Sequence, residues 1–506
     1  MKTITTLPKV LIEADGAPLP PQELLAVGSI RLQQRLSLPT LCELLFCDPP
    51  GPLSAASRLQ PGAGLRISLR DGSEPLFTGQ VTAIEHAYGP ANQRQIRVRG
   101  YDRLHSLRKR QSVRAHMQVR LPEFAEELVA DLGLRVQPTQ SGPLWSRFTQ
   151  HRQSDFDLLS EIAERSGLFF FLRHEVLHLL TLQGMGEPIR LSLGDSLLEA
   201  RFEANGEPAC RMVTVAGWNT QRVEPHTSQA SSPRSGRSVP TEVSPGLLGG
   251  RGERGLLDEA AQDESQAQAI AQIELDRYAA YEVTLWGVAE GDPRLQPGAR
   301  IALEGVADAC RGQYVLSSVN HTLDDRTGFL SEFSTVPPPL RERPHGTTAT
   351  YGVVTRVDDP EGLGRVQVAL PTFQDLETDW MGVLAAGAGA DKGLIILPDV
   401  GDTVLVLHGH GDPERGIVLG GLYGAQGAPD PGVEAGAVRR YTLLTPGGQI
   451  IRLDDGEQTV RLENGHGSYV ELTPSAVRLH AAADLTLEAP GYSIFIRGQR
   501  IDFERA

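Results

Sequence analysis

Cysteine is scarce in this chain, and its spacing disfavours cysteine-based sites. The 506 residues include only Cys42, Cys47, Cys210 and Cys310, and no two of them form a C-x-x-C pair. Structural zinc sites and redox dithiols use such closely spaced thiols, and stable disulfides need an oxidising compartment. We therefore expect isolated core thiols in a reducing cytosol, with no metal ion and no cofactor.

Long apolar runs are also missing. The first residues, MKTITTLPKVLIEADG, contain no sustained apolar stretch of the kind that a signal peptide carries. No later run approaches the length of about 18 apolar residues that a membrane span needs. We expect synthesis in the cytoplasm without a signal peptide.

Basic residues are too few for a protein whose main partner is nucleic acid. The chain has 48 Lys and Arg against 63 Asp and Glu, which gives a net charge of −15. Residues 346–425 contain four basic and eleven acidic residues, or −7. Phosphate binding requires a basic face, so we predict that nucleic acid is not a partner.

Short alternating runs, broken by Gly and Pro, fill most of the chain and predict a mainly β protein with short helices. The three consecutive prolines of VPPPLRERPHG, residues 336–346, mark a domain boundary because proline continues neither a helix nor a central strand. Residues 1–345 form one predicted region of β-barrel subdomains with helical insertions. Within it, the Ser-, Pro-, Gly- and Arg-rich residues 225–257 predict a flexible loop.

Three helices are predicted within residues 1–345. In LPEFAEELVADLG the apolar residues recur every four positions between Pro122 and Gly133. In SDFDLLSEIAERSG, Ser154 is the expected N-cap and Gly167 the expected stop. A third, Ala-rich helix is expected near 263–280.

Residues 346–425 predict a five-stranded barrel of the OB type. YGVVTRVDDPEGLGRVQVALP reads as a hairpin with a typical turn, and GLIILP and GDTVLVLHGHGDPERGIVLGGLY supply further short strands. The cluster of His408, His410 and Asp412 within the last segment could ligate a metal ion, but a tight turn at a strand end explains the same residues.

The segment HEVLH, from His174 to His178, matches the H-E-x-x-H pattern of zinc peptidases. In that chemistry two His one helical turn apart bind zinc, and the Glu acts as general base. Here the flanking residues predict a hairpin with His174 and Glu175 at its turn. We therefore expect no enzyme, and a metallopeptidase acting through His174, Glu175 and His178 is the alternative.

Residues 451–503 repeat one short motif. Seven pairs of apolar residues, each bracketing one residue, predict seven strands of about three residues with one apolar face. Half burial of that face in a lone sheet falls short, since ordering the chain costs about 1 to 2 kcal/mol per residue and half-buried side chains contribute less. A single-chain β-solenoid is one alternative, but its repeats are usually longer and supply a fuller interior. We favour the other, in which identical chains wind about a common axis and cover the apolar face mutually. The predicted core of this needle, residues 426–506, is Val460, Leu462, Val470, Leu472, Val477, Leu479, Leu485, Leu487, Ile494 and Ile496.

Several motifs, in one shared order, resemble the VgrG-type spike of contractile injection systems, in which the hub and needle of a phage tail are fused. They are QHRQSDFDLLSEIAERSGLFFFLRH, WGVAEGDPRLQPGARIAL, GQYVLSSVNHTLDDRTGFLSEF and GDTVLVLHGHGDPERGIVLGGLY. The resemblance implies a β-barrel hub, an OB-fold collar and an intertwined trimeric β-needle. It also implies a structural spike that caps the inner tube, organises the baseplate centre and pierces the target envelope when the sheath contracts.

The resemblance implies partners as well. They are two further copies of the chain, the inner tube protein, baseplate proteins and a conical PAAR-like tip protein, with the target membrane crossed only transiently. The last pair, Ile501 and Phe503, is the expected platform for the tip protein. Because no effector domain follows the needle, the chain is most similar to spikes of phage-tail-like particles that are released outside the bacterium. A type VI secretion spike is the alternative.

Overall fold

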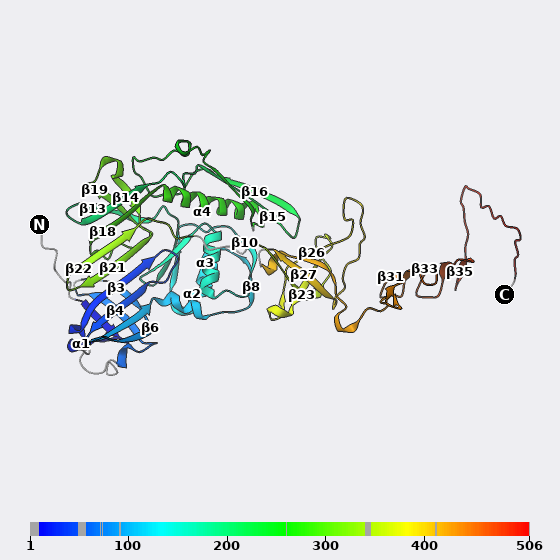
Figure 1. Ribbon diagram of the computed structural model, residues 1–506, viewed down its shortest axis with the longest axis horizontal. Helices are drawn as coiled ribbons and strands as arrows, with labels where there is room; N and C mark the ends of the chain where they lie inside the picture. The colour runs from blue at the N-terminus through cyan, green and yellow to red at the C-terminus, as the bar shows by residue number, and fades with distance from the viewer. Residues whose placement is uncertain are drawn as a thin grey trace. The chain divides into compact units, whose positions relative to one another are not determined.

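The computed structural model describes most of the chain, which divides into two compact units, Met1–Gly421 and Leu422–Ala506. Strands dominate, and helices are few (Figure 1). The predicted fold class, mainly β with short helices, is confirmed. Among the described residues no helix is long and apolar enough to cross a bilayer. The residues that the structure describes are 10–48, 57–70, 72, 74–90, 93–259, 261–339, 346–409 and 412–504.

An eleven-stranded sheet organises the hub, residues 10–339 (Figure 1). Its strand β3 pairs with β4 on one side and with β21 on the other, so the two ends of the hub lie side by side. Along β4, Cys42, Leu44 and Phe46 are buried, as alternation predicts. In sheet order the strands are β14 (Leu197–Ala204), β18 (Val283–Glu290), β22 (Gly328–Ser334), β21 (Ser318–Asp324), β3 (Val27–Arg35), β4 (Leu41–Cys47), β7 (Arg94–Tyr101), β6 (Pro75–Tyr88), β5 (Gly64–Leu69), β1 (Val10–Ala14) and β2 (Ala17–Pro18).

The three predicted helices form where the sequence places them. Ser154 caps one of them, accepting a hydrogen bond from the N–H of Asp157 at 3.1 Å. Gly167, with a φ of 74°, follows its end in the left-handed conformation that glycine adopts without strain. The helices are α1 (Pro21–Leu25), α2 (Leu121–Val129), α3 (Asp155–Arg165) and α4 (Glu264–Glu282).

Three smaller sheets complete most of the hub. One of them contains the hairpin that carries the HEVLH segment. The sheets are β8 (Arg114–Val119) with β10 (Trp145–Gln150), then β9 (Arg135–Pro138) with β11 (Phe169–Arg173) and β12 (Val176–Leu180), and then β13 (Met185–Ser192) with β19 (Ala299–Glu304) and β20 (Gly312–Val315).

The segment 225–257, predicted as a flexible loop, carries a strand at each end. Strands β16 (Glu224–Ala230) and β17 (Glu253–Glu259) occupy its two ends and pair with β15 (Met212–Asn219). Between them, Arg234 lies 2.8 Å from Asp276 of α4, and Arg237 donates to the carbonyl of Ala279. The segment is polar because its side chains bind the helix α4, a contact that composition does not reveal.

The OB barrel lies in the first unit and closes on itself. Its strand order is β23-β27-β28-β26-β24, and an additional β23–β24 pairing completes the barrel around a core that includes Val354, Val368 and Val406. The predicted strand GLIILP is not a strand, and Leu394 to Leu397 are exposed, because the closed barrel leaves no free edge there. The strands are β23 (Thr347–Arg356), β24 (Arg365–Leu370), β25 (Leu376–Glu377), β26 (Met381–Val383), β27 (Thr403–Gly409) and β28 (Gly416–Gly421).

The second unit contains a five-stranded antiparallel meander. Four of the seven predicted strands form. The three predicted around 485–487, 494–496 and 501–503 do not, and no strand is present in the described residues after His480. A strand forms by pairing with a neighbour, and these three segments pair with no other strand of the described residues. The elements are β29 (Val433–Glu434), β30 (Ala437–Val438), β31 (Arg440–Leu444), β32 (Ile450–Asp454), β33 (Thr459–Glu463), β34 (Tyr469–Leu472) and β35 (Val477–His480).

Candidate functional site

The meander β31–β35 carries two rows of apolar side chains on one face. Antiparallel pairing places residues directly opposite one another on the same face of the sheet. Each row therefore crosses all five strands in register. The rows are Tyr441, Leu453, Val460, Leu472 and Val477, and Leu443, Ile451, Leu462, Val470 and Leu479.

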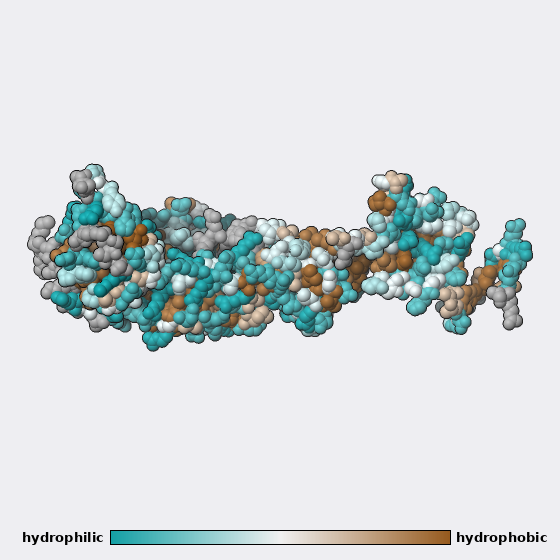
Figure 2. All heavy atoms as spheres, turned by 90° about the horizontal axis from the view of Figure 1, so that it is seen from below, coloured by the Kyte–Doolittle hydropathy of each residue, from teal (hydrophilic) through white to brown (hydrophobic). Residues whose placement is uncertain are grey.

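This apolar face is exposed in the single chain. Val477 is 73% exposed and Leu462 is 54% exposed, and only Val470 among the ten is less than one-third open. Apolar side chains of these strands reach the surface in Figure 2. Large contiguous apolar patches on soluble proteins mark contact surfaces. The face is therefore the leading candidate site of the chain.

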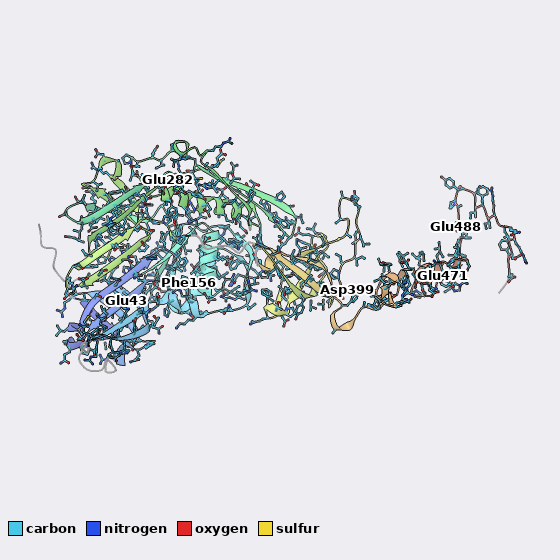
Figure 3. The ribbon with its side chains drawn as sticks, viewed as in Figure 1. Glu43, Phe156, Glu282, Asp399, Glu471 and Glu488 are labelled. Atoms are coloured by element: carbon cyan, nitrogen blue, oxygen red, sulfur yellow. The ribbon has the colours of Figure 1, made fainter. Side chains whose placement is uncertain are left out.

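On the opposite face of the meander, charged side chains pair with one another within the chain. Arg461 lies 3.0 Å from Glu471 on the neighbouring strand, and Arg478 lies 3.4 Å from the same carboxylate, which Figure 3 labels. Arg461 also stacks on Tyr469, with its guanidinium 4.2 Å from the ring centroid. The polar face thus stiffens the sheet from within the chain, which leaves the apolar face as the one without a partner.

Local turn chemistry sets the register of the meander. Asp454 accepts a hydrogen bond from the N–H of Glu457 in the β32–β33 turn. Asn464 accepts hydrogen bonds from the N–H groups of His466 and Ser468 in the β33–β34 turn, each at 3.0 Å. Asp and Asn favour such turns because their side chains bond the backbone a few residues on. These turns fix the register between neighbouring strands, so the apolar pairs of all five strands lie on the same face of the sheet.

Ion pairs around Arg440 stabilise the start of the meander. Arg440 binds the carboxylates of Asp430 and Glu434. This pairing, with the N–H of Gly432, lowers the pKa of Asp430 to about 2. Asp430 therefore stays ionised under all ordinary conditions and keeps the entry to β31 fixed.

The remaining predicted site residues lie beyond the meander. Leu485, Leu487, Ile494 and Ile496 have no strand partner, and each is more than half exposed. Figure 3 labels Glu488 in the same segment. Ile501 and Phe503, the predicted tip platform, are also exposed. The structure of one chain brings six of the ten predicted core residues into two rows and leaves the other four outside them.

Two members of the rows were missed in the sequence. Tyr441 and Leu443 of β31 show the same bracketed pair, ten residues before Ile451. The pattern was therefore present one repeat earlier than the predicted start. Their pairing with β32 makes β31 the first strand of the exposed face.

The HEVLH segment does not have zinc peptidase geometry. His174 and Glu175 occupy the β11–β12 turn with φ values of 45° and 63°, and His178 lies on β12. His174 Nε2 lies 3.1 Å from the Glu74 carboxylate, and burial lowers the pKa of both histidines. The predicted hairpin is confirmed. Because the two imidazoles are not one helical turn apart on a common face, they do not form the pair that the zinc peptidase mechanism requires.

The second candidate cluster, in GHGDPE, also lacks a ligand set. His408 lies inside the barrel wall on β27, and Asp412 pairs with Arg415 at 3.1 Å. His410 lies outside the described residues. Within the described part of the chain, no group of three or more His, Cys, Asp or Glu is arranged to hold a metal ion.

Two family models match the chain. Residues 35–327 match the phage tail baseplate hub (GPD), and residues 350–423 match the type VI secretion system/phage-baseplate injector OB domain. The second match confirms the OB prediction. Together they cover the hub and the barrel described above, and neither includes the meander.

Curated relatives are similar over parts of their length. A type VI secretion system spike protein VgrG1c of Pseudomonas aeruginosa is 24% identical over 426 residues, which are 76% of this chain and 57% of that protein. The actin cross-linking toxin VgrG1 of Vibrio cholerae is 27% identical over 194 residues, 33% of this chain and 18% of that protein. The chain thus spans between about one-fifth and three-fifths of the curated relatives it matches.

Solved structures share the fold at low identity. The c3393 protein of E. coli, described as a component of the type VI secretion system with similarity to T4 tail proteins gp27 and gp5, matches with a TM-score of 0.53 and 15% identity, over 81% of this chain and 99% of that one. A chain of the Francisella PdpA-VgrG complex matches with a TM-score of 0.54 and 10% identity, over 93% of this chain and 79% of that one.

Proposed function

Because this chain belongs to the phage tail baseplate hub (GPD) family, we propose that it is the spike of a contractile injection machine, assembled as a homotrimer. In this role it caps the inner tube, organises the centre of the baseplate and pierces the target envelope when the sheath contracts. The observation that carries the proposal is the pair of exposed apolar rows on β31–β35.

The rows favour copies of the same chain as their partner. Full burial of an apolar side chain contributes about 1.5 to 3 kcal/mol, so covering the exposed half of ten of them contributes about 8 to 15 kcal/mol per chain. On the opposite face, Arg461 and Arg478 are already paired with Glu471 of the same chain, so these charges contribute little to binding a dissimilar partner. Three identical meanders wound about one axis cover each other's apolar rows and pair their free edges.

The residues after His480 extend the same surface. Leu485 and Leu487, and Ile494 and Ile496, continue the spacing of the rows and are exposed. In the trimer each of these short segments gains neighbours from two other chains. We propose that they become the distal part of the needle core. Ile501 and Phe503 then form the platform for a conical PAAR-like tip protein.

Relatives support the wider set of partners. The Francisella complex pairs a VgrG with PdpA, and the E. coli structure is described as a type VI component similar to phage tail proteins. By analogy, we propose that the inner tube protein and baseplate proteins bind the hub of this chain. The role is mechanical and uses no catalytic group.

The particle type is a separate proposal. We propose assembly in the bacterial cytoplasm and release as part of a phage-tail-like extracellular particle. A type VI secretion system is the second candidate, favoured by the curated spike proteins that match. Electron microscopy of culture supernatant and of cell envelopes distinguishes them, because only the first yields free contractile particles that carry this chain.

One measurement tests the trimer directly. Light scattering of the purified full-length chain should give three times its mass of 54.8 kDa. A stable monomer at micromolar concentration contradicts the proposal. A dimer also contradicts it, because the needle requires threefold winding.

A further inference from the structure

The OB barrel meets the hub through a stack of aromatic and imidazole rings. Phe373, in a short turn after β24, lies between His151 of the hub and His408 of β27, with ring centroids 5.5 Å and 6.1 Å from its own. Arg222 of the hub pairs with Glu361 of the barrel at 3.0 Å. Arg147, on β10, donates to the backbone carbonyl of Glu377. The stack is therefore part of the junction between two domains of one chain.

Three of the four imidazole nitrogens in this stack are buried and make no hydrogen bond of normal geometry. His408 is 2% exposed, and neither of its ring nitrogens makes a hydrogen bond of normal geometry. Nδ1 of His151 is also buried and unpartnered. A neutral imidazole always carries one N–H, so the His408 ring buries at least one hydrogen-bond donor without an acceptor, which costs free energy. Buried polar groups without partners are rare in native proteins and call for an explanation.

Burial favours the neutral form of both rings. It lowers the pKa of His408, an effect that His151 reinforces and that Asp412 and the Pro413 backbone partly offset. Burial likewise lowers the pKa of His151, with smaller opposing effects from the backbone of Thr149 and from nearby charges. His321, a fully buried histidine of the hub, differs because both of its ring nitrogens have partners, Ser331 and the carbonyl of Leu295.

Six charged groups from hub and barrel alike act on His151, His408 and Arg415. Protonation of both rings would bring two further positive charges close together, since His151 already acts to lower the pKa of His408. Burial already lowers the pKa of Arg415 to about 10. The six groups are Arg152, Arg165 and Arg415, and Glu161, Glu259 and Asp412.

We propose that the His151–Phe373–His408 stack is an acid-sensitive latch between hub and OB barrel, closed while both imidazoles are neutral and released when they gain protons. The sign follows from linkage. In the open junction the histidines return toward their ordinary pKa of about 6.5, so they bind protons more readily there than in the closed one. Closure is therefore fully favourable above that pH and weakens as the pH falls below it. The latch lies within one chain and does not depend on the proposed trimer.

Hydrogen exchange of the full-length protein tests the latch. Peptides that cover β10 and β27 are compared at about pH 7.5 and about pH 5.5, with exchange times scaled for the intrinsic rate. Their exchange should accelerate at the lower pH, by up to about tenfold per pH unit for each histidine that binds a proton on opening. The exchange rates of peptides from β4 and β7, in the eleven-stranded sheet of the hub, should not change. Equal protection of β10 and β27 at both pH values would overturn the proposal.

Variants separate the stack from other titrating groups. In the double variant His151→Phe and His408→Phe the acid effect on β10 and β27 should disappear, whereas the exposed control His86→Phe should retain it. Persistence of the effect in the double variant overturns the proposal. If the double variant does not fold, imidazole C2 exchange in the wild-type protein decides. His151 and His408 should then titrate below the ordinary histidine pKa of about 6.5, and titration at that value refutes the latch.

Discussion

The substitution Leu479→Ala tests whether the apolar rows bind other copies of the chain. Leu479 ends one row on β35 and is 56% exposed in the single chain. Removing a fully buried leucine side chain costs about 2 to 5 kcal/mol. If neighbouring copies cover the exposed half, the loss in association is about 1 to 3 kcal/mol per chain, or about 3 to 9 kcal/mol per trimer.

The adjacent residue provides a matched control. Arg478 lies on the same strand, points to the opposite face and has a side chain that is 63% exposed, paired with Glu471 at 3.4 Å. Exposed ion pairs contribute about 0 to 1 kcal/mol, and this one lies within a chain. Arg478→Ala should therefore leave association almost unchanged.

Sedimentation of both variants over a range of concentrations measures the difference. At about 1.4 kcal/mol for each tenfold step, Leu479→Ala should raise the trimer dissociation constant by roughly two to six orders of magnitude. Circular dichroism should show that the hub and barrel of both variants stay folded. The reasoning is refuted if the two variants dissociate alike, or if Leu479→Ala leaves the trimer as stable as the wild type.

Two further predictions concern the tip and the barrel. Deleting residues 490–506 should leave the hub folded and abolish binding of the tip protein in a pull-down, and retained binding would refute the platform at Ile501 and Phe503. In the barrel, the buried pair of Asp359 and Arg365, 2.7 Å apart, holds the pKa of Asp359 well below its usual range. Stability from this pair is present above the ordinary carboxyl pKa of about 4 and is lost as the pH falls further, so Asp359→Asn should be destabilising near neutral pH and progressively less so in acid. Thermal unfolding across that range measures this, and a difference that does not shrink in acid would contradict the assigned pairing.

Local patterns predicted the short elements well. The four-residue spacing in LPEFAEELVADLG and the Ser154 cap predicted α2 and α3, and bracketed pairs predicted strands β32 to β35. These signals succeed because helix and strand periods depend on neighbours within a few residues. They fail for GLIILP, whose apolar run is typical of a buried strand, because barrel closure through β23 and β24 leaves it no partner.

Contacts between distant segments account for the other misses. Polar composition predicted a loop over 225–257, but β15 pairs with both of its ends and Arg234 binds Asp276 on α4. Nothing near His408 in the sequence indicates that its ring is buried against Phe373.

The sequence by itself determined that this protein is mainly β and that its C-terminal strands have one apolar face. Alternation and turn residues are local, so they can be read without a structure. Only the tertiary structure decided which strands share a sheet, that the apolar pairs align into two rows, and that two histidines are enclosed between hub and barrel. Those facts depend on pairings between residues far apart in the chain, and no local pattern specifies them.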